Sequence, residues 1–398
     1  MDSGVDENYS VRIGKIFTVS PRCEAGSDEE LRKPCARSGH AAVADDKYLY
    51  VYGGYNPDIS VDDEEMEMED YNPLFKEMWR FDFDRQSWEL LKNRGTVPMQ
   101  LASMSMTRCG HIIILYGGTG FPFGYQKSSA LFCFSTRDNR WRAISGSKET
   151  PDSTYGQSVS VCGTSLYVFG GTSGWDYSAN VYKSDLRTGI WEKCFDFEKH
   201  YSMLIDRQID EKDIPLPRYR HEMLSDEENL YIIGGGTSHH AFPLERIHVF
   251  NTKLKKWTRR DSIPDPVHGF PRRRRCHGCC QLRNVGYITG GYDGRHIYND
   301  VWSLAIDSLQ WTKLEAKLPE PVYFHSSAIT PEGCLYYHGG VLTSDGKTRT
   351  DKLNFLWVTV PSLVTMSWKC ILKANPKLRD KSADVLRELG IPEHIIKR

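Results

Sequence analysis

The sequence predicts an all-β fold, a six-bladed β-propeller that is closed by an N-terminal strand and followed by a short α-helical hairpin. Three observations support this fold. Six diglycines end short apolar runs, a Trp follows each of the first five, and the periodicity changes from strand-like to helix-like near residue 361. We therefore expect a disordered N-terminus over residues 1–8, a propeller over 9–360 and a helical tail over 361–398.

The diglycines recur at intervals of 49 to 64 residues. They are Gly53-Gly54, Gly117-Gly118, Gly170-Gly171, Gly234-Gly235, Gly290-Gly291 and Gly339-Gly340. The distance to the next Trp is 21 to 24 residues in four units and 35 in the first. The acidic run DDEEMEMED accounts for that excess, and we expect a mobile, solvated loop insert over residues 56–70.

Each unit is predicted to contain four strands, and its Trp lies in the fourth: Trp88, Trp141, Trp191, Trp257 and Trp311. Nine residues earlier stands a large or β-prone residue of the third strand: Trp79, Phe132, Tyr182, His248 and Trp302. A four-stranded sheet cannot bury both of its faces alone, so the units must stack radially. Gly suits a close approach of two backbones, and Trp supplies the apolar contact between blades.

The sixth unit lacks a fourth strand. Its third strand surrounds Trp357, and the residues that follow are helix-like. The alternating run Lys15-Ile16-Phe17-Thr18-Val19 is therefore predicted to complete this last blade. The pattern of diglycine, Tyr and Trp over residues 9–360 resembles the kelch-repeat propellers, which serve many unrelated roles, so the fold does not by itself define a function.

Composition adds limits on compartment and partners. The net charge is -1, and the 11 Cys are uneven in spacing and odd in number, which favours reduced thiols in an intracellular protein. The chain opens without a charged and then apolar leader, and its apolar runs are shorter than the roughly 20 residues of a membrane helix. We expect a cytoplasmic protein, with the nucleus as a second compartment, and no membrane partner.

The tail is predicted to be an αα-hairpin. Ser362 caps a first helix with Leu363, Met366, Cys370 and Ile371 on one face, and a second helix runs from Ser382 to Gly390. One possibility is that this hairpin simply caps the underside of the propeller.

The same segment also resembles the elongin-binding box of cullin-2 substrate receptors. The resemblance rests on Ser362-Leu363, Ser367 and Ile371, followed by Ile391-Pro392, which is similar to a cullin box. It implies elongin B, elongin C and cullin-2 as partners. The family prefers Cys where this chain has Ser367, and a small residue there still suits a helix-in-groove contact anchored by Leu363.

In a propeller, the loops from strand four to the next strand one, and from strand two to strand three, gather on one rim. The first class of loops, from strand four to the next strand one, is located by counting back 14 or 15 residues from each diglycine. The second class, from strand two to strand three, is located by counting forward from it. The first gives Ser38, Ser103, Tyr155, Tyr219, Arg220, Arg275, Phe324 and His325. The second gives Trp175, Tyr177, His239, Tyr292 and Arg295.

This aromatic and basic set suits the C-terminal carboxylate of a peptide, because Arg offers it bidentate hydrogen bonds. The kelch receptors that this chain resembles bind substrates that end in Gly. The resemblance implies that the residues that bind the substrate carboxylate are among Arg220, Arg275 and Arg295. Each Arg could equally be structural. His40, His221 and His277 share one repeat position and are expected to be structural.

Other site types find little support. The run Arg272–Arg275 lacks interleaved aromatics, so we expect no nucleic-acid partner. Cys276, Cys279 and Cys280 lack a second ligand pair for zinc, and Gly234–Gly236 leads into a strand rather than a helix. We find no nucleophile with an ordered His and carboxylate, and we expect a non-catalytic protein without metal or cofactor.

Two functions remain open. The first is a substrate-recognition subunit of a cullin-2-type RING ubiquitin ligase that binds Gly-ending C-terminal degrons. The second, also implied by the resemblance, is a scaffold or regulator of stress-activated MAP kinase signalling through a protein phosphatase. A receptor needs an exposed Leu363, whereas a scaffold could bury it under the propeller, so the exposure of this residue discriminates between them.

Overall fold

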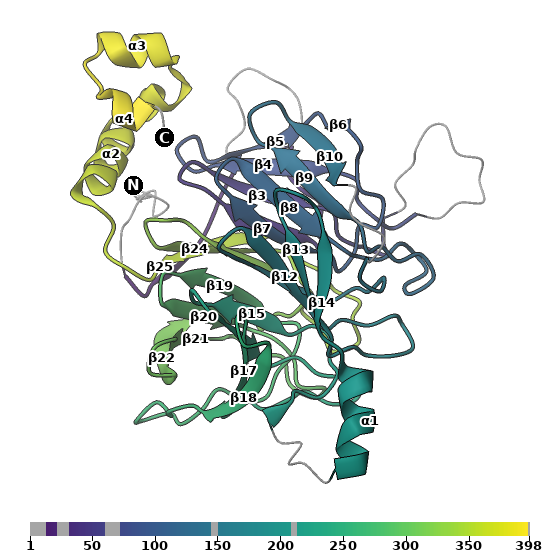
Figure 1. Cartoon of the computed structure of the whole chain (residues 1–398). Helices are drawn as coiled ribbons and strands as arrows, with labels where there is room; N and C mark the ends of the chain where they lie inside the picture. Colours follow the sequence, from purple (N-terminus) through teal and green to yellow (C-terminus); the bar gives the residue numbers. More distant parts are fainter. Residues whose placement is uncertain (1–12, 22–31, 60–71, 145–149, 208–212, 397–398) are drawn as a thin grey trace.

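The structure is a computed structural model that describes residues 13–21, 32–59, 72–144, 150–207 and 213–396. The predicted disorder over 1–8 and most of the acidic insert over 56–70 lie outside these residues. The described strands form six sheets arranged radially, and the helical tail lies at one edge of this ring (Figure 1). The prediction of a six-bladed all-β propeller is confirmed.

The first three blades follow each other along the chain. Blade 1 contains β2 (Ala41–Ala44), β3 (Tyr48–Tyr52), β4 (Met78–Asp82) and β5 (Ser87–Leu91). Blade 2 contains β7 (Ser105–Cys109), β8 (Ile112–Tyr116), β9 (Leu131–Ser135) and β10 (Arg140–Ile144), with β6 (Arg94–Gly95) parallel to β10. Blade 3 contains β11 (Ser158–Cys162), β12 (Ser165–Phe169), β13 (Val181–Asp185) and β14 (Trp191–Phe195).

The remaining blades complete the ring. Blade 4 contains β15 (Glu222–Ser225), β16 (Asn229–Ile233), β17 (Arg246–Asn251) and β18 (Lys256–Asp261). Blade 5 contains β19 (Gly278–Leu282), β20 (Val285–Thr289), β21 (Asp300–Ala305) and β22 (Gln310–Lys317). Blade 6 contains β23 (Ser326–Ile329), β24 (Cys334–His338), β25 (Leu353–Trp357) and β1 (Ile16–Thr18).

The ring is closed by the N-terminal strand, as predicted. β1 runs antiparallel to β25, with Phe17 opposite Phe355 and Ile16 opposite Leu356. Phe17 is only 4% exposed, and its ring stacks on that of Phe355 with centroids 5.4 Å apart. The first and last strands of the propeller therefore share one hydrophobic core.

The diglycines are required by the contact between neighbouring blades. His221 of blade 4 lies between Gly235 of its own blade and Gly170 of blade 3. A Cβ on Gly170 would lie 2.7 Å from the His221 ring, and one on Gly235 would lie 2.4 Å from its Cβ. Both glycines also have positive φ, +67° and +81°, which side chains disfavour.

The fourth-strand Trp residues pack on the preceding blade. The ring of Trp141 in β10 lies 4.8 Å from that of Tyr52 in β3, and Trp191 in β14 lies 5.4 Å from Tyr116 in β8. All four side chains are buried. Each such aromatic pair adds about 0.5–1.5 kcal/mol beyond the area that it buries, so the Trp repeat stabilises the blade interfaces.

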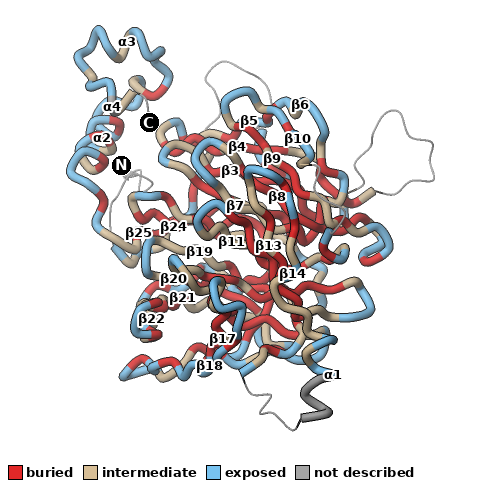
Figure 2. Tube along the Cα trace, in the orientation of Figure 1, coloured by how far each residue is buried: buried red, intermediate tan, exposed pale blue. Residues whose placement is uncertain are grey.

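Four α-helices and one short 3₁₀ helix occur among the described residues. Helix α1 (Phe197–Arg207), which was not predicted, lies between blades 3 and 4. The tail comprises α2 (Leu363–Ala374), η3 (Pro376–Asp380), α3 (Ala383–Glu388) and α4 (Glu393–Ile396). The propeller strands are largely buried and the tail is largely exposed (Figure 2). In the described parts of the chain, no helix is both long and apolar enough to cross a membrane.

Candidate functional site

Six backbone hydrogen bonds form a closed ring around the central channel. The N–H of Gly39 at the start of blade 1 donates to the carbonyl of Phe324 in blade 6 at 3.0 Å. Each following blade repeats this bond to the blade before it, with lengths of 2.7 to 3.0 Å. The six residues have positive φ, between 53° and 67°: Gly39, Ser103, Gly156, Arg220, Cys276 and Phe324. The backbone at the channel mouth is thus fixed, and any side chain on it is held on a rigid frame.

A layer of buried side chains lies one residue further along each blade: His40, Met104, Gln157, His221, His277 and His325. Nε2 of His221 lies 3.1 Å from the carbonyl oxygen of Phe169, and Nε2 of His325 lies 2.8 Å from Oγ1 of Thr289. Burial lowers the pKa of both rings to about 3, so they are neutral near pH 7.

The predicted structural role of His40, His221 and His277 agrees with this layer. His325 was predicted to lie at the rim, but the structure places it in the same buried layer. The reason is that blade 6 has one residue more than blades 4 and 5 between this position and its diglycine.

A pocket of about 250 Å³ opens at the rim above the ring. Both predicted loop classes contribute to it, and its walls are mainly aromatic and small side chains. It is lined by Ser38, Gly39, Tyr55, Ala102, Ser103, Phe123, Tyr155, Tyr219, Arg220, Tyr323, Phe324, Val341, Gly346 and Arg349. Concave sites with an apolar wall and a few convergent polar groups are typical ligand sites.

Arg220 reaches across the channel mouth. Its backbone belongs to blade 4, yet its guanidinium donates a hydrogen bond to the hydroxyl of Ser103 in blade 2. The same group lies 4.5 Å from the ring centroid of Phe324 in blade 6. Arg220 therefore forms part of the pocket floor and presents its positive charge to both the pocket and the channel beneath.

A second guanidinium enters the pocket from blade 6. Nε of Arg349 donates to Oγ of Ser38 at 3.1 Å, and Nη1 donates to the carbonyl of Gly346 at 2.9 Å. The guanidinium also lies 5.0 Å from the ring centroid of Tyr55. One pocket thus contains two arginines, two serine hydroxyls and a wall of phenol rings. This arrangement suits a ligand that has an anionic group and an adjoining side chain.

Arg349, Tyr55 and Phe123 line the pocket but are not among the predicted rim residues. All three lie in the loop from strand two to strand three, in blades 6, 1 and 2. The residues predicted for that loop class lie in blades 3, 4 and 5 alone, and they include Trp175 and Tyr292. Tyr55 and Phe123 lie two and six residues after Gly53 and Gly117, within the range of the predicted loop residues, whereas Arg349 lies ten residues after Gly339 and outside that range.

Six of the predicted rim residues line the pocket: Ser38, Ser103, Tyr155, Tyr219, Arg220 and Phe324. Tyr177 lies behind them, because its ring packs on Tyr219 at 5.4 Å and its hydroxyl accepts from the N–H of Ser238 at 2.8 Å. Trp175 does not line the pocket and is 77% exposed on its loop.

The other predicted rim residues lie outside the pocket. The buried guanidinium of Arg275 donates to the carbonyl of Thr237 and lies 5.7 Å from the ring centroid of Tyr292. Tyr292 stacks on the pocket residue Tyr323 at 4.9 Å. His239 and Arg295 are exposed in the loops of blades 4 and 5. Of the three arginines proposed as carboxylate ligands, the pocket contains Arg220 alone.

The basic run and the Cys cluster have structural surroundings. Arg274 is fully buried and bridges to Asp300 at 2.6 Å, which leaves Arg272 and Arg273 as the exposed members of the run. Burial raises the pKa of the Cys276 thiol to about 11, so it remains protonated. Among the described residues, no group of three or more His, Cys, Asp or Glu could hold a metal ion.

Helix α2 has one docked face and one open face. Thr365, Trp368 and Leu372 are buried, and the last two form a small core with residues of η3, α3 and α4. On the other side Leu363 is 77% exposed and Ile371 is 40% exposed. Ser367 is also exposed on this helix. The helix and its Ser362 cap follow the prediction, whereas the buried residues Thr365, Trp368 and Leu372 are not those of the predicted apolar face.

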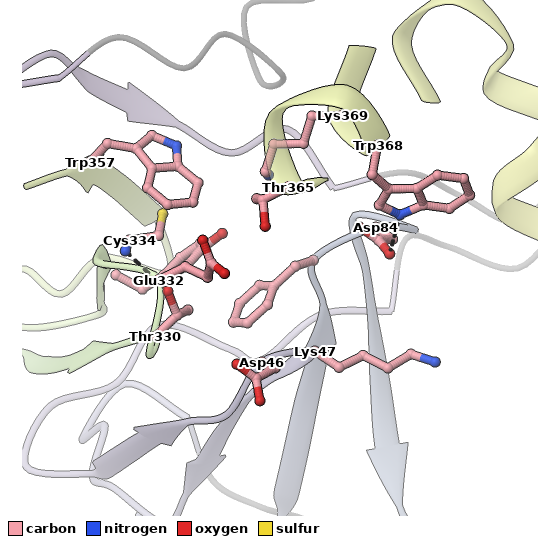
Figure 3. Close-up of a pocket in the computed structure, with 12 residues that line it drawn as sticks. Asp46, Lys47, Asp84, Thr330, Glu332, Cys334, Trp357, Thr365, Trp368 and Lys369 are labelled. Atoms are coloured by element: carbon pink, nitrogen blue, oxygen red, sulfur yellow. Dashed lines mark hydrogen bonds between the residues drawn. The ribbon is translucent and has the colours of Figure 1, made fainter. Parts of the chain in front are cut away.

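The docked face of α2 binds turns on the rim opposite the pocket. Nε1 of Trp368 donates to the carboxylate of Asp84 in the β4–β5 turn at 2.8 Å. The backbone N–H of Ser362 donates to Glu332 in the β23–β24 turn at 2.7 Å. Figure 3 shows Trp368, Asp84 and Glu332 around the groove between α2 and the propeller. Since these hairpin turns and the pocket loops lie at opposite ends of the blades, the tail and the pocket face opposite ways.

The two cullin-box-like residues lie at the far end of the tail. Ile391 is half-buried and packs in the core around Trp368, while Pro392 is exposed. The predicted partner residues are therefore divided: Leu363, Ser367, Ile371 and Pro392 are accessible, and Ile391 supports the tail itself.

Comparisons with known proteins match this architecture. The family model described as the KLHDC2/KLHL20/DRC7 kelch-repeats domain matches residues 26–202 and 194–383. The chain is 41% identical to kelch domain-containing protein 10 of Xenopus laevis over 373 residues, which cover 93% of this chain and 87% of that protein. It is 41% identical to the Homo sapiens protein of that name over 367 residues, 92% and 80% of the two chains.

A more distant relative is the kelch domain-containing protein 10 homolog of Drosophila melanogaster, 34% identical over 389 residues, which cover 92% of this chain and 62% of that protein. The matches extend across the blades and beyond, and they support a propeller that acts in protein interactions. The chain belongs to the kelch-repeat family, among the relatives of kelch domain-containing protein 10.

Proposed function

We propose that this chain is the substrate-recognition subunit of a cullin-2-type RING ubiquitin ligase. The rim pocket binds the C-terminus of a substrate protein, and the tail binds elongin B, elongin C and cullin-2. The observation that carries the proposal is the exposure of Leu363, at 77%, on a helix whose opposite face is docked. A tail that merely capped the propeller would bury its apolar residues, whereas an amphipathic helix that leaves them open suits a partner groove.

The pocket supports the substrate half of the proposal. Arg220 and Arg349 provide guanidinium donors for a carboxylate, and Ser38 and Ser103 provide hydroxyls beside them. Capture of a C-terminal carboxylate by such donors is a recurrent mode of peptide recognition. A pocket of about 250 Å³ suits the last few residues of a chain rather than a folded surface. Small terminal residues such as Gly would let the carboxylate approach both arginines.

The relative position of the two sites also fits this role. The pocket opens on the rim formed by the strand-two to strand-three loops, and α2 contacts the hairpin turns at the other end of the blades. A substrate and a ligase could therefore bind together without competing for one surface.

The tail is tested by pulldown of purified elongin B and C with the full chain and its Leu363→Ser variant. We expect binding by the wild type and loss of at least tenfold in the variant. The matched control is Leu389→Ser, which removes another exposed leucine of the same tail and leaves α2 intact. Absence of binding in the wild type, or equal loss in both variants, would reject the ligase role and favour the scaffold in stress-kinase signalling.

The pocket is tested with synthetic peptides that end in Gly, each made with a free carboxylate and with a C-terminal amide. We expect the free acid to bind at least tenfold more tightly, because the amide removes the charge that the two arginines bind. Equal affinity for acid and amide would reject C-terminal recognition, whatever the result of the pulldown.

A further inference from the structure

We propose that the rim carries a second subsite beside the pocket, an aromatic ledge formed by Phe123, Tyr125 and Trp175. This ledge binds an apolar side chain that lies a few residues before the C-terminus of the substrate. The inference rests on the proposed function, and it specifies which C-termini the receptor prefers.

The ledge is unusually exposed for its composition. Tyr125 is 74% exposed, Trp175 is 77% exposed and Phe123 is 41% exposed. Large aromatic side chains that gather on an open surface commonly mark sites of protein or peptide recognition. These three residues come from the β8–β9 and β12–β13 loops, in the neighbouring blades 2 and 3.

Both loops are braced from within by the same device. The hydroxyl of Thr119 accepts from the N–H of Gly124 at 3.0 Å and donates to the carbonyl of Gln126 at 3.0 Å. The hydroxyl of Thr172 accepts from the N–H of Gly174 at 3.0 Å and donates to the carbonyl of Asp176 at 2.7 Å. The exposed rings are therefore held on ordered loops, which lowers the entropic cost of using them for binding.

The two loops also touch each other. A Cβ built on Gly124 would lie 3.1 Å from the Cα of Gly174, and 3.8 Å from the hydroxyl of the pocket residue Tyr155. Only glycine permits two backbones to approach so closely. This approach brings Phe123 and Tyr125, the neighbours of Gly124, next to Trp175. The two loops therefore meet at the boundary between the blades, and the three aromatic residues adjoin this contact.

The ledge is also continuous with the pocket. The ring of Phe123 lies 4.8 Å from that of Tyr55, and Tyr55 lies 5.0 Å below the guanidinium of Arg349. Phe123 and Tyr55 both line the pocket. A peptide whose carboxylate is bound by the arginines can therefore continue over this aromatic surface, about 3.3 Å per residue when extended.

The chemistry of the ledge selects an apolar side chain. The exposed basic residues Arg272, Arg273 and Arg295 belong to blade 5 and its entry segment, whereas the ledge loops present indole and phenol rings. Asp176 is exposed beside Trp175 and disfavours an acidic neighbour by repulsion. An aliphatic or aromatic residue of the peptide gains binding free energy by covering the indole face of Trp175, whereas a small polar residue gains little.

The test uses fluorescence polarisation with eight-residue peptides that end in Gly and carry Ser at the upstream positions. One position at a time, from the third to the sixth from the end, is changed to Leu or to Asp. We expect Leu to tighten binding about tenfold at one or two positions and Asp to weaken it there. In the double variant Tyr125→Ala/Trp175→Ala the gain from Leu should vanish while affinity for the all-Ser peptide stays within twofold.

Tyr201→Ala is the matched control, since it removes an exposed aromatic residue on α1 and should leave the gain from Leu intact. The ledge is rejected if Leu gives no gain at any position, or if the gain persists in the double variant. If either result is found while the chain still prefers peptides with a free carboxylate over amides, only the proposal of the ledge is rejected. Loss of that preference would reject the pocket and the ledge together.

Discussion

Trp368 of the tail and Asp84 of the first blade are joined by a hydrogen bond of 2.8 Å, from the indole N–H to the carboxylate. The two residues are 284 positions apart in the sequence, and Trp368 is buried where it meets the propeller. Because the same helix exposes Leu363, this bond helps to fix the orientation of the proposed partner-binding face relative to the pocket on the opposite rim. Asp84 is thus a positioning residue for the proposed ligase.

Asp84→Ala is expected to loosen the tail without unfolding the propeller. Removing the acceptor leaves a buried indole N–H unsatisfied, which costs about 1–3 kcal/mol of docking free energy. Amide hydrogen exchange in α2 should therefore quicken by at least fivefold, while exchange in β2 to β5 stays unchanged. Asp46→Ala is the control, since Asp46 lines the same groove and is exposed. Equal amide exchange rates in α2 of both variants would show that the Trp368–Asp84 hydrogen bond does not contribute to the docking of the tail.

Phe17→Ala is expected to destabilise the whole propeller, because Phe17 is buried against Phe355 where the N-terminal strand closes the ring. Loss of a buried Phe side chain costs about 3–5 kcal/mol, which urea unfolding measures directly. Ile13→Ala removes an exposed residue of the same segment and should change stability by less than about 0.5 kcal/mol. A stable Phe17→Ala variant would show that the ring does not depend on this closure.

The fold was predictable because the blade contacts impose a strict repeat. A diglycine position such as Gly170 accepts no Cβ, and a fourth-strand Trp such as Trp141 fills one blade interface. The closing strand followed from the absence of a fourth strand after Trp357. These constraints are local and periodic, so they are visible in one sequence without any relative.

The site was less predictable because it depends on contacts across the ring. Arg220 meets Ser103 of another blade, and no spacing in the sequence indicates which side chains converge over the channel. Arg275 occupies the predicted loop, but its guanidinium donates to the carbonyl of Thr237 and lies over the ring of Tyr292 instead of entering the pocket. The one-residue excess in blade 6 moved His325 from the rim to the buried layer. Repeat counting therefore locates loops, whereas packing decides which of their residues reach the pocket.

Arg349→Ala is expected to weaken binding of a Gly-ending peptide about 10- to 150-fold, the loss of one charge-assisted contact of about 1.5–3 kcal/mol. Arg349→Lys should recover only part of it, since Lys lacks the planar fork that binds a carboxylate at two points. Arg295→Ala, in the corresponding loop of blade 5, should remain within twofold of wild type because Arg295 lies outside the pocket. Isothermal titration calorimetry measures all three, and a stronger effect of Arg295 would reverse this assignment.

Glu222 predicts a pH dependence of stability. This half-buried carboxyl lines the central channel, where desolvation raises its pKa to about 8 although Arg220 opposes the shift. The folded state therefore keeps a proton that the unfolded chain releases near its ordinary value of 4.5. The contribution of this carboxyl to stability is greatest below that value and is lost as pH rises from about 4.5 through about 8.

Glu222→Gln removes this titration and keeps the shape of the side chain. Thermal unfolding between pH 5.5 and pH 8.5 should show the wild-type Tm falling more than that of the variant, with the difference growing toward pH 8. Asp261→Asn, which alters an exposed carboxylate of the same blade, should leave the wild-type slope unchanged. Parallel Tm curves for wild type and Glu222→Gln would mean that the carboxyl is ionised in the channel at neutral pH, with water or a bound cation replacing the solvation that it loses there.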